Sequence, residues 1–126
     1  MSKVVHFEIP ADNIERARKF YHEIFGWKIN AYPGMEYTIF HTGPTDKEGM
    51  SQEKGFINGG MMRREGELKN PIITIDVPDI EKAFDKIVSQ GGKIIRKKMD
   101  VGDMGYSAYF KDSEGNIMGL WQNKTK

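Results

Sequence analysis

Two polar residues near the start of the chain, His6 and Glu8, are the strongest candidates for chemistry. They lie in the segment VVHFEI, where polar and apolar residues alternate with the period of a β-strand. Residues two apart on a strand share a face, so their Cα atoms would lie about 6.6 Å apart. A histidine beside a carboxylate can act as a general base or acid near neutral pH. The pair therefore predicts a catalytic site, an ordinary polar lining or a dimer contact, and the sequence leaves these open.

The elements that position this pair occur twice along the chain. When the sequence is aligned with itself so that His6 falls on Ile72, Ile9 falls on Ile75 and Gly26 on Gly92. Each half then begins with a strand, continues with a helix and ends with three short strands. The predicted strands after the helices are 28–31, 36–41 and 56–63 in the first half, and 93–97, 106–111 and 117–122 in the second. The sequence predicts one α+β domain over 1–126, made of two tandem βαβββ modules at about 3–64 and about 70–124.

Capping residues and apolar spacing define the two helices. Asn13 and Asp79 stand at matching N-cap positions, and Gly26 and Gly92 at matching helix ends. Apolar residues recur with a period of 3.6, which predicts one buried face on each helix. The predicted buried residues are Ile14, Ala17, Phe20, Tyr21, Ile24 and Phe25 in the first helix and Ile80, Ala83, Phe84, Ile87 and Val88 in the second.

The stretch 42–55 carries glycine, proline and charge without periodicity. It predicts a long loop between strands. A loop of this length is either functional, for instance as a lid, or merely tolerated.

These features resemble the vicinal oxygen chelate superfamily, which includes glyoxalase I, extradiol dioxygenases, fosfomycin-inactivating enzymes and bleomycin-binding resistance proteins. The resemblance rests on the paired halves and on the motifs HFEIP, FYHEIFGW and FKDSEGNIMGLWQ. It implies that the modules form a bent mixed sheet, a cup, with the helices on the outer face. It also implies a homodimer, since many relatives pair modules between two chains.

In metal-dependent members of the superfamily, four ligands come from the first and last strand of each module. Carried over by spacing, these positions are His6, Gly59, Ile72 and Gly119. Only His6 offers a ligating atom, whereas a divalent ion requires three or four protein ligands. The resemblance therefore implies a cup with no catalytic metal and no other cofactor.

Residues on the predicted inner face are candidates for ligand binding. Aromatic side chains could line a pocket for a flat ligand, and methionines could adapt to it, although both residue types more often pack in the core. The predicted ligand-binding residues are His6, Gly59, Met61, Ile72, Thr74, Gly119 and Trp121.

Composition excludes several other classes of function. Nineteen basic and eighteen acidic residues give a net charge of +1, which provides no field for nucleic acid or an anionic membrane. The chain has no cysteine, so it has no disulfides or thiolate sites, and no apolar stretch is long enough for a signal peptide or a membrane span. We expect a cytoplasmic protein.

The leading expectation for function is a metal-independent cup that binds a small aromatic or bulky apolar molecule. One alternative is a metal-free acid–base enzyme using His6 and Glu8. Another is a metal-dependent lyase or dioxygenase resembling glyoxalase I, and the last is a structural domain whose cup is closed by its own side chains.

Overall fold

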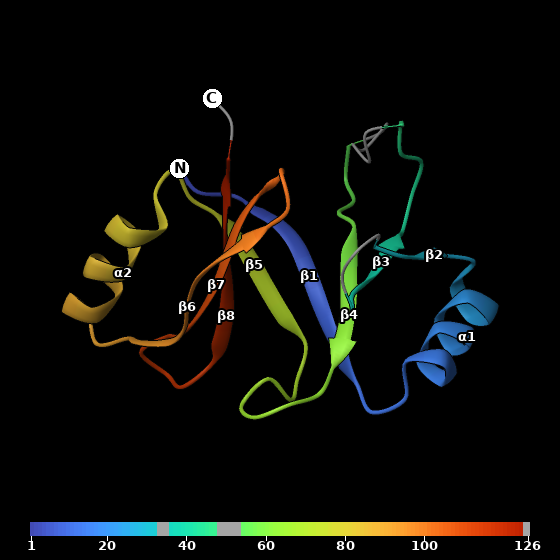
Figure 1. The fold of residues 1–126 in the computed structure, drawn as a ribbon, viewed down its shortest axis with the longest axis horizontal. Coiled ribbons are helices and arrows are strands. Elements are labelled where there is room, and N and C mark those ends of the chain that lie inside the picture. Colours follow the sequence, from blue (N-terminus) through green and yellow to red (C-terminus); the bar gives the residue numbers. More distant parts are fainter. Residues whose placement is uncertain (33–35, 48–53, 125–126) are drawn as a thin grey trace. The chain divides into compact units, whose positions relative to one another are not determined.

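The computed structural model describes residues 1–32, 36–47 and 54–124, which form eight β-strands and two α-helices. Their contacts divide them into two compact units. The first half is His6–Pro71, and the second half runs from Ile72 onward and includes Met1–Val5. The predicted α+β class is confirmed, and the order βαβββ occurs twice (Figure 1).

The first half carries one helix on its strands. Its elements are β1 (Val4–Ala11), α1 (Ile14–Phe25), β2 (Lys28–Ala31), β3 (Thr38–His41) and β4 (Gly59–Arg63). The strands lie in the order β2-β3-β4-β1, with β1 and β4 parallel and the other pairs antiparallel.

The second half has the same arrangement. Its elements are β5 (Ile72–Asp76), α2 (Ile80–Ser89), β6 (Lys93–Val101), β7 (Gly105–Lys111) and β8 (Ile117–Asn123). The strands lie in the order β5-β8-β7-β6, with β5 and β8 parallel. Each parallel pair joins the first and last strand of a half, which brings residues distant in sequence side by side.

Some strand boundaries differ from those predicted. β4 begins at Gly59 instead of residue 56, because the preceding backbone is held by Thr42. The Thr42 hydroxyl donates to the carbonyl of Ile57 at 2.7 Å, and the Thr42 amide donates to the Asn58 side chain at 3.0 Å. Part of the predicted loop 42–55, residues 48–53, lies outside the described residues.

The helix caps follow the predictions with one exception. The side chains of Asn13 and Asp79 accept from backbone amides of the first turns, and Gly26 ends α1 with a φ of 73°. The prediction that Gly92 takes this role for α2 is wrong, since the positive φ of 96° belongs to Gly91. Gly92 instead permits close approach, because a Cβ there would lie 2.5 Å from Cγ2 of Ile87.

Each helix covers an apolar core of its own half. In the first half, buried Ala11, Ile29, Phe40 and Met61 form the centre of the core, with Phe7, Ile9, Ile14, Ala17, Tyr21 and Trp27 packed against it. In the second half the centre is Ile80, Ala108, Phe110 and Leu120. The predicted helix faces are too wide, since Phe20, Ile24, Phe25 and Val88 are each more than half exposed. In the described residues, neither helix is long and apolar enough to span a membrane.

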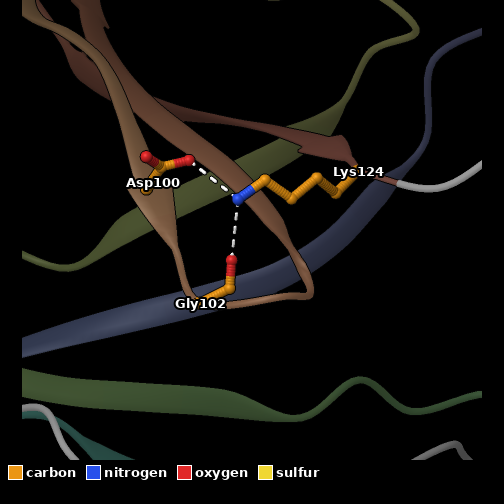
Figure 2. Close-up of polar contacts among 3 residues, drawn as sticks. All are labelled: Asp100, Gly102 and Lys124. Atoms are coloured by element: carbon orange, nitrogen blue, oxygen red, sulfur yellow. Dashed lines mark hydrogen bonds and ion pairs between the residues drawn. The ribbon is translucent and has the colours of Figure 1, made fainter.

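The end of β8 is anchored to the β6–β7 hairpin (Figure 2). Lys124 Nζ donates to Oδ1 of Asp100 and to the carbonyl of Gly102, each at 2.9 Å. The same ammonium lies 5.0 Å from the centroid of the Tyr106 ring. These contacts hold the last strand of the second half beside the turn that joins β6 and β7.

Candidate functional site

A chain of hydrogen bonds joins His6 to Glu8 through Tyr37, the residue before β3. Nε2 of His6 lies 2.9 Å from the hydroxyl of Tyr37, and this hydroxyl donates to Oε2 of Glu8 at 2.8 Å. Glu8 is buried and His6 is half-buried. The predicted alternation along β1 is confirmed, because Phe7 and Ile9 pack toward the core while His6 and Glu8 meet Tyr37.

Gly60 makes room for the ring that completes this chain. Glu8 is the register partner of Gly60 in the parallel β1–β4 pair. A Cβ built on Gly60 would collide with the hydroxyl and ring of Tyr37. Only glycine at this position lets the Tyr37 ring lie against β4 and reach the carboxylate of Glu8.

Burial controls the protonation of His6. Loss of solvation lowers the pKa of its imidazole from the ordinary 6.5 to about 4. The imidazole is therefore neutral at pH 7. The hydroxyl of Tyr37 donates its single proton to Glu8, so Nε2 of His6 carries the hydrogen that Tyr37 accepts. Nδ1 is then left with a lone pair.

The second half has the same backbone arrangement with different side chains. Thr74 pairs with Gly119 as Glu8 pairs with Gly60. Thr38 pairs with Met61, the residue after Gly60. In the same way, Ala108 pairs with Leu120, the residue after Gly119. Ser107, the residue before Ala108, therefore corresponds to Tyr37.

The corresponding positions in the second half hold smaller groups. Ser107 lacks the phenol ring of Tyr37, and Thr74 replaces the carboxylate of Glu8. Thr74 is buried, and its hydroxyl lies beside Gly119 of β8. The nearest atom to a Cβ built on Gly119 is Oγ1 of Thr74 at 2.9 Å, with no aromatic ring closer.

The predicted ligand-binding residues fall on two different faces. Strand register places Ile72, Thr74, Gly119 and Trp121 on the face of the second half opposite its helix, as predicted. The placement of Gly59 and Met61 on the face of His6 is wrong. A Cβ on Gly59 would meet the ring of Phe7 at 2.5 Å, and Met61 is fully buried in the core. The residue equivalent to Gly119 is Gly60, because the alignment of β4 on β8 is displaced by one residue.

The residues at the metal-ligand positions of this fold do not fit a metal. Nε2 of His6 is bonded to Tyr37, and Gly60 has no room for a ligating side chain. Ile72 has no lone pair, and Gly119 has no side chain. Across the described residues, no three His, Asp or Glu side chains cluster as a metal site would require. The absence of a metal from the site stays a prediction, and Gly60 now takes the position that was assigned to Gly59.

Three residues of the site were missed from the sequence: Tyr37, Gly60 and Ser107. Tyr37 is one aromatic residue among many in the chain, and it precedes β3 by one residue. Two adjacent glycines, Gly59 and Gly60, gave a signal that a side chain approaches this strand closely. The sequence does not say which glycine faces which side, so the partner ring could not be identified.

A separate hollow lies at the start of α1 in the first half. It has a volume of about 510 Å³ and is lined by Asp12, Asn13, Ile14, Glu15, Ala31, Glu36, Tyr37, Thr38, Met61 and Arg63. Its lining carries three carboxylates, those of Asp12, Glu15 and Glu36, and one guanidinium, that of Arg63. The candidate site of the first half is the face that carries His6, Glu8 and Tyr37, and the corresponding face of the second half is described by itself.

The paired βαβββ units are the fold of the vicinal oxygen chelate proteins. A family described as bleomycin resistance protein-like N-terminal matches residues 3–43. A glyoxylase-like domain-containing protein of Didymella fabae is 30% identical over 121 residues, covering 90% of this chain and 88% of that protein. The chain belongs to this glyoxalase and bleomycin resistance family.

Other relatives agree in fold but differ in length. CFP32, a candidate glyoxylase of Mycobacterium tuberculosis, is 30% identical over 110 residues, which span 84% of this chain and only 40% of that protein. The methylmalonyl-CoA epimerase of Mycobacterium tuberculosis superposes with a TM-score of 0.62 at 12% identity, covering 97% of this chain and 88% of its own. At this identity the similarity to the epimerase establishes the fold alone.

Proposed function

We propose that this protein binds a small molecule without a metal, and that the second half takes a flat aromatic ligand bearing a hydroxyl. One observation carries the proposal. In the first half a tyrosine ring lies against Gly60 and its hydroxyl bonds to Glu8. The equivalent positions of the second half, Ser107, Gly119 and Thr74, lack that ring but keep a glycine and a hydroxyl.

The surroundings of Gly119 suit an aromatic ligand. Tyr109 is its register partner on β7, and Trp121 shares its face two residues along β8. Trp121 donates from Nε1 to the Asn123 side chain at 2.9 Å, which fixes the orientation of its indole. Aromatic side chains of this kind stack on a ligand ring in offset or edge-on geometry.

The expected affinity of a bare phenol is low. Burying one ring of about 150 Å² contributes about 4 kcal/mol at about 25 cal/mol per Å². Loss of translational and rotational freedom offsets much of this, so a simple phenol is expected to bind with a Kd of about 1 mM or weaker. The natural ligand would be a larger molecule that presents such a ring.

The test uses p-cresol, which reproduces the tyrosine side chain. Titrated into ¹⁵N-labelled protein, it is expected to shift the amide signals of Thr74, Ser107 and Gly119, with saturation at millimolar concentration. Toluene, which lacks the hydroxyl, should bind at least several-fold more weakly because it cannot form a hydrogen bond with the Thr74 hydroxyl. Shifts confined to other residues, or none at about 10 mM, would contradict the proposal.

A matched pair of variants at Ser107 separates the proposed site from general hydrophobic binding. Ser107→Tyr should abolish the p-cresol response, because its own ring would occupy the space over Gly119 as Tyr37 does over Gly60. Ser107→Ala should retain the response. Gly119→Val provides a second blocked variant if Ser107→Tyr fails to fold. Zn²⁺ or Ni²⁺ alone should leave the melting temperature of wild-type protein unchanged, since a rise would place a metal in the site.

Acid–base catalysis is the second candidate function. It is favoured by the bonded series His6, Tyr37 and Glu8, which connects a neutral imidazole to a buried carboxylate. One protein of the same fold is an epimerase, and epimerisation at carbon requires removal and return of a proton. Wild-type protein acting this way would exchange an acidic C–H proton of its ligand for deuterium.

A homodimer in the cytoplasm is also part of the proposal. It rests on the family resemblance and on the apolar side chains that α1 exposes, Phe20, Ile24 and Phe25. Sedimentation equilibrium should give about twice the chain mass at micromolar concentration. A monomer at about 100 μM would contradict the dimer while leaving the ligand proposal untouched.

A further inference from the structure

We propose that Tyr37 relays a proton between His6 and Glu8, so that a proton accepted at Nδ1 of His6 is stored on the carboxylate of Glu8. This inference concerns the first half and does not depend on the aromatic ligand proposed for the second. It assigns separate roles to the three residues: His6 accepts, Tyr37 transmits and Glu8 stores.

The geometry provides a continuous path. The two donor–acceptor distances are 2.9 Å between His6 Nε2 and Tyr37 Oη and 2.8 Å between Tyr37 Oη and Glu8 Oε2. Both are ordinary hydrogen-bond distances, across which a proton can pass from one heavy atom to the next without rearrangement of the backbone. Nδ1 of His6 has no bonded partner in the described part of the chain.

The transfer balances with one co-reactant, a Brønsted acid such as the hydronium ion of the solvent. A proton from a donor molecule forms a new N–H bond at Nδ1. The Nε2–H bond breaks and its proton passes to Tyr37 Oη, while the original hydroxyl proton of Tyr37 passes to Oε2 of Glu8. The imidazole ends neutral in its other tautomer, Tyr37 is again a phenol and Glu8 is a carboxylic acid. The donor retains the electron pair of its broken bond.

Burial explains why a relay serves better than His6 alone. An imidazolium at this position would be poorly solvated, which is why the pKa of His6 is lowered to about 4. In the relay the imidazole carries its positive charge only in passing. The proton comes to rest on a carboxylate whose negative charge it neutralises, so no isolated buried cation is left.

Gly60 is a positioning residue for the relay. Tyr37 lies one residue before β3, and its ring reaches the carboxylate only because no side chain projects from β4 at this point. His6 and Tyr37 lie with ring centroids 6.4 Å apart and planes at 23°. The near-parallel rings keep Nε2 and the hydroxyl oxygen in reach of each other.

The experiment follows the tautomer of His6 by ¹⁵N NMR of histidine-labelled protein, without any ligand. At pH 7 His6 should be neutral with hydrogen on Nε2. As pH falls, the relay requires a swap to the Nδ1–H tautomer before any imidazolium appears, together with the infrared C=O band of a protonated carboxyl. In Tyr37→Phe, which keeps the ring, the swap should disappear and His6 should pass directly to imidazolium.

Internal controls and a second readout keep the test decisive. His22 is exposed and bonds through Nδ1 to the carbonyl of Trp27, so its signals provide a reference outside the relay that Tyr37→Phe should leave unchanged. At pH 7 the Tyr37 hydroxyl proton should be visible in slow exchange, with a cross-peak to the Nε2 hydrogen of His6. Direct formation of imidazolium in wild type, or the same behaviour in Tyr37→Phe, would overturn the relay and leave the ligand proposal standing.

Discussion

Replacing Phe40 with alanine is expected to lower the free energy of unfolding by about 4 kcal/mol, the usual cost of removing a buried phenylalanine. Phe40 is fully buried on β3. Its ring centroid lies 5.3 Å from that of Trp27, 5.6 Å from Tyr21 and 6.1 Å from Phe7. Alanine would leave a cavity that these three rings cannot fill by collapsing. Urea denaturation followed by tryptophan fluorescence measures the effect.

The control for this prediction is Phe20→Ala on α1. Phe20 is 54% exposed, so its removal should cost less than about 1 kcal/mol. Equal losses in the two variants would mean that the aromatic cluster is not the centre of the core. Because Phe40 anchors the strand that Tyr37 precedes, Phe40→Ala should also weaken the hydrogen bond between Tyr37 and Glu8.

Lowering the pH from 7 to about 4.5 is expected to destabilise the protein by about 2 kcal/mol through His6. Burial lowers the pKa of His6 to about 4 in the folded state, against 6.5 in a free histidine. Between these two pH values the His6 imidazole binds a proton in the unfolded chain but not in the folded protein. The stability that depends on neutral His6 is therefore fully present above about pH 6.5 and is lost as the pH falls toward 4.

Comparison with His6→Gln isolates this contribution. Glutamine keeps a polar side chain near Tyr37 but does not titrate in this range, so the variant should lose about 2 kcal/mol less than wild type over the same interval. Urea unfolding at a series of pH values measures both proteins. Parallel curves for the two would show that His6 is not held neutral by the fold.

Much of the fold could be predicted because the helices and strands of each half are marked by residues close together in the sequence. Asn13 and Asp79 mark the helix starts, and alternation along β1 assigns Phe7 and His6 to opposite faces. These signals depend on residues close in sequence. The helix end near Gly92 was misjudged because two adjacent glycines, Gly91 and Gly92, have different tasks that the sequence alone does not separate.

The site was predicted only in part, because it depends on register between distant strands. His6 and Glu8 follow from one strand, whereas Tyr37 and Gly60 join them through two separate pairings. Aligning β4 on β8 by its turn residues selected Gly59. A one-residue displacement exchanges the faces of a strand, so Gly59 and Met61 were assigned to the wrong side.

The presence of Tyr37 in one half and Ser107 in the other also bears on how the protein can change over generations. A substitution near Tyr37 disturbs an internal hydrogen bond and is therefore penalised through folding. A substitution near Ser107 alters a face that the chain does not fill with a ring of its own, so its effect falls on whatever molecule binds there. We expect the second half to diversify in ligand preference among related sequences while the first half preserves the structure that supports it.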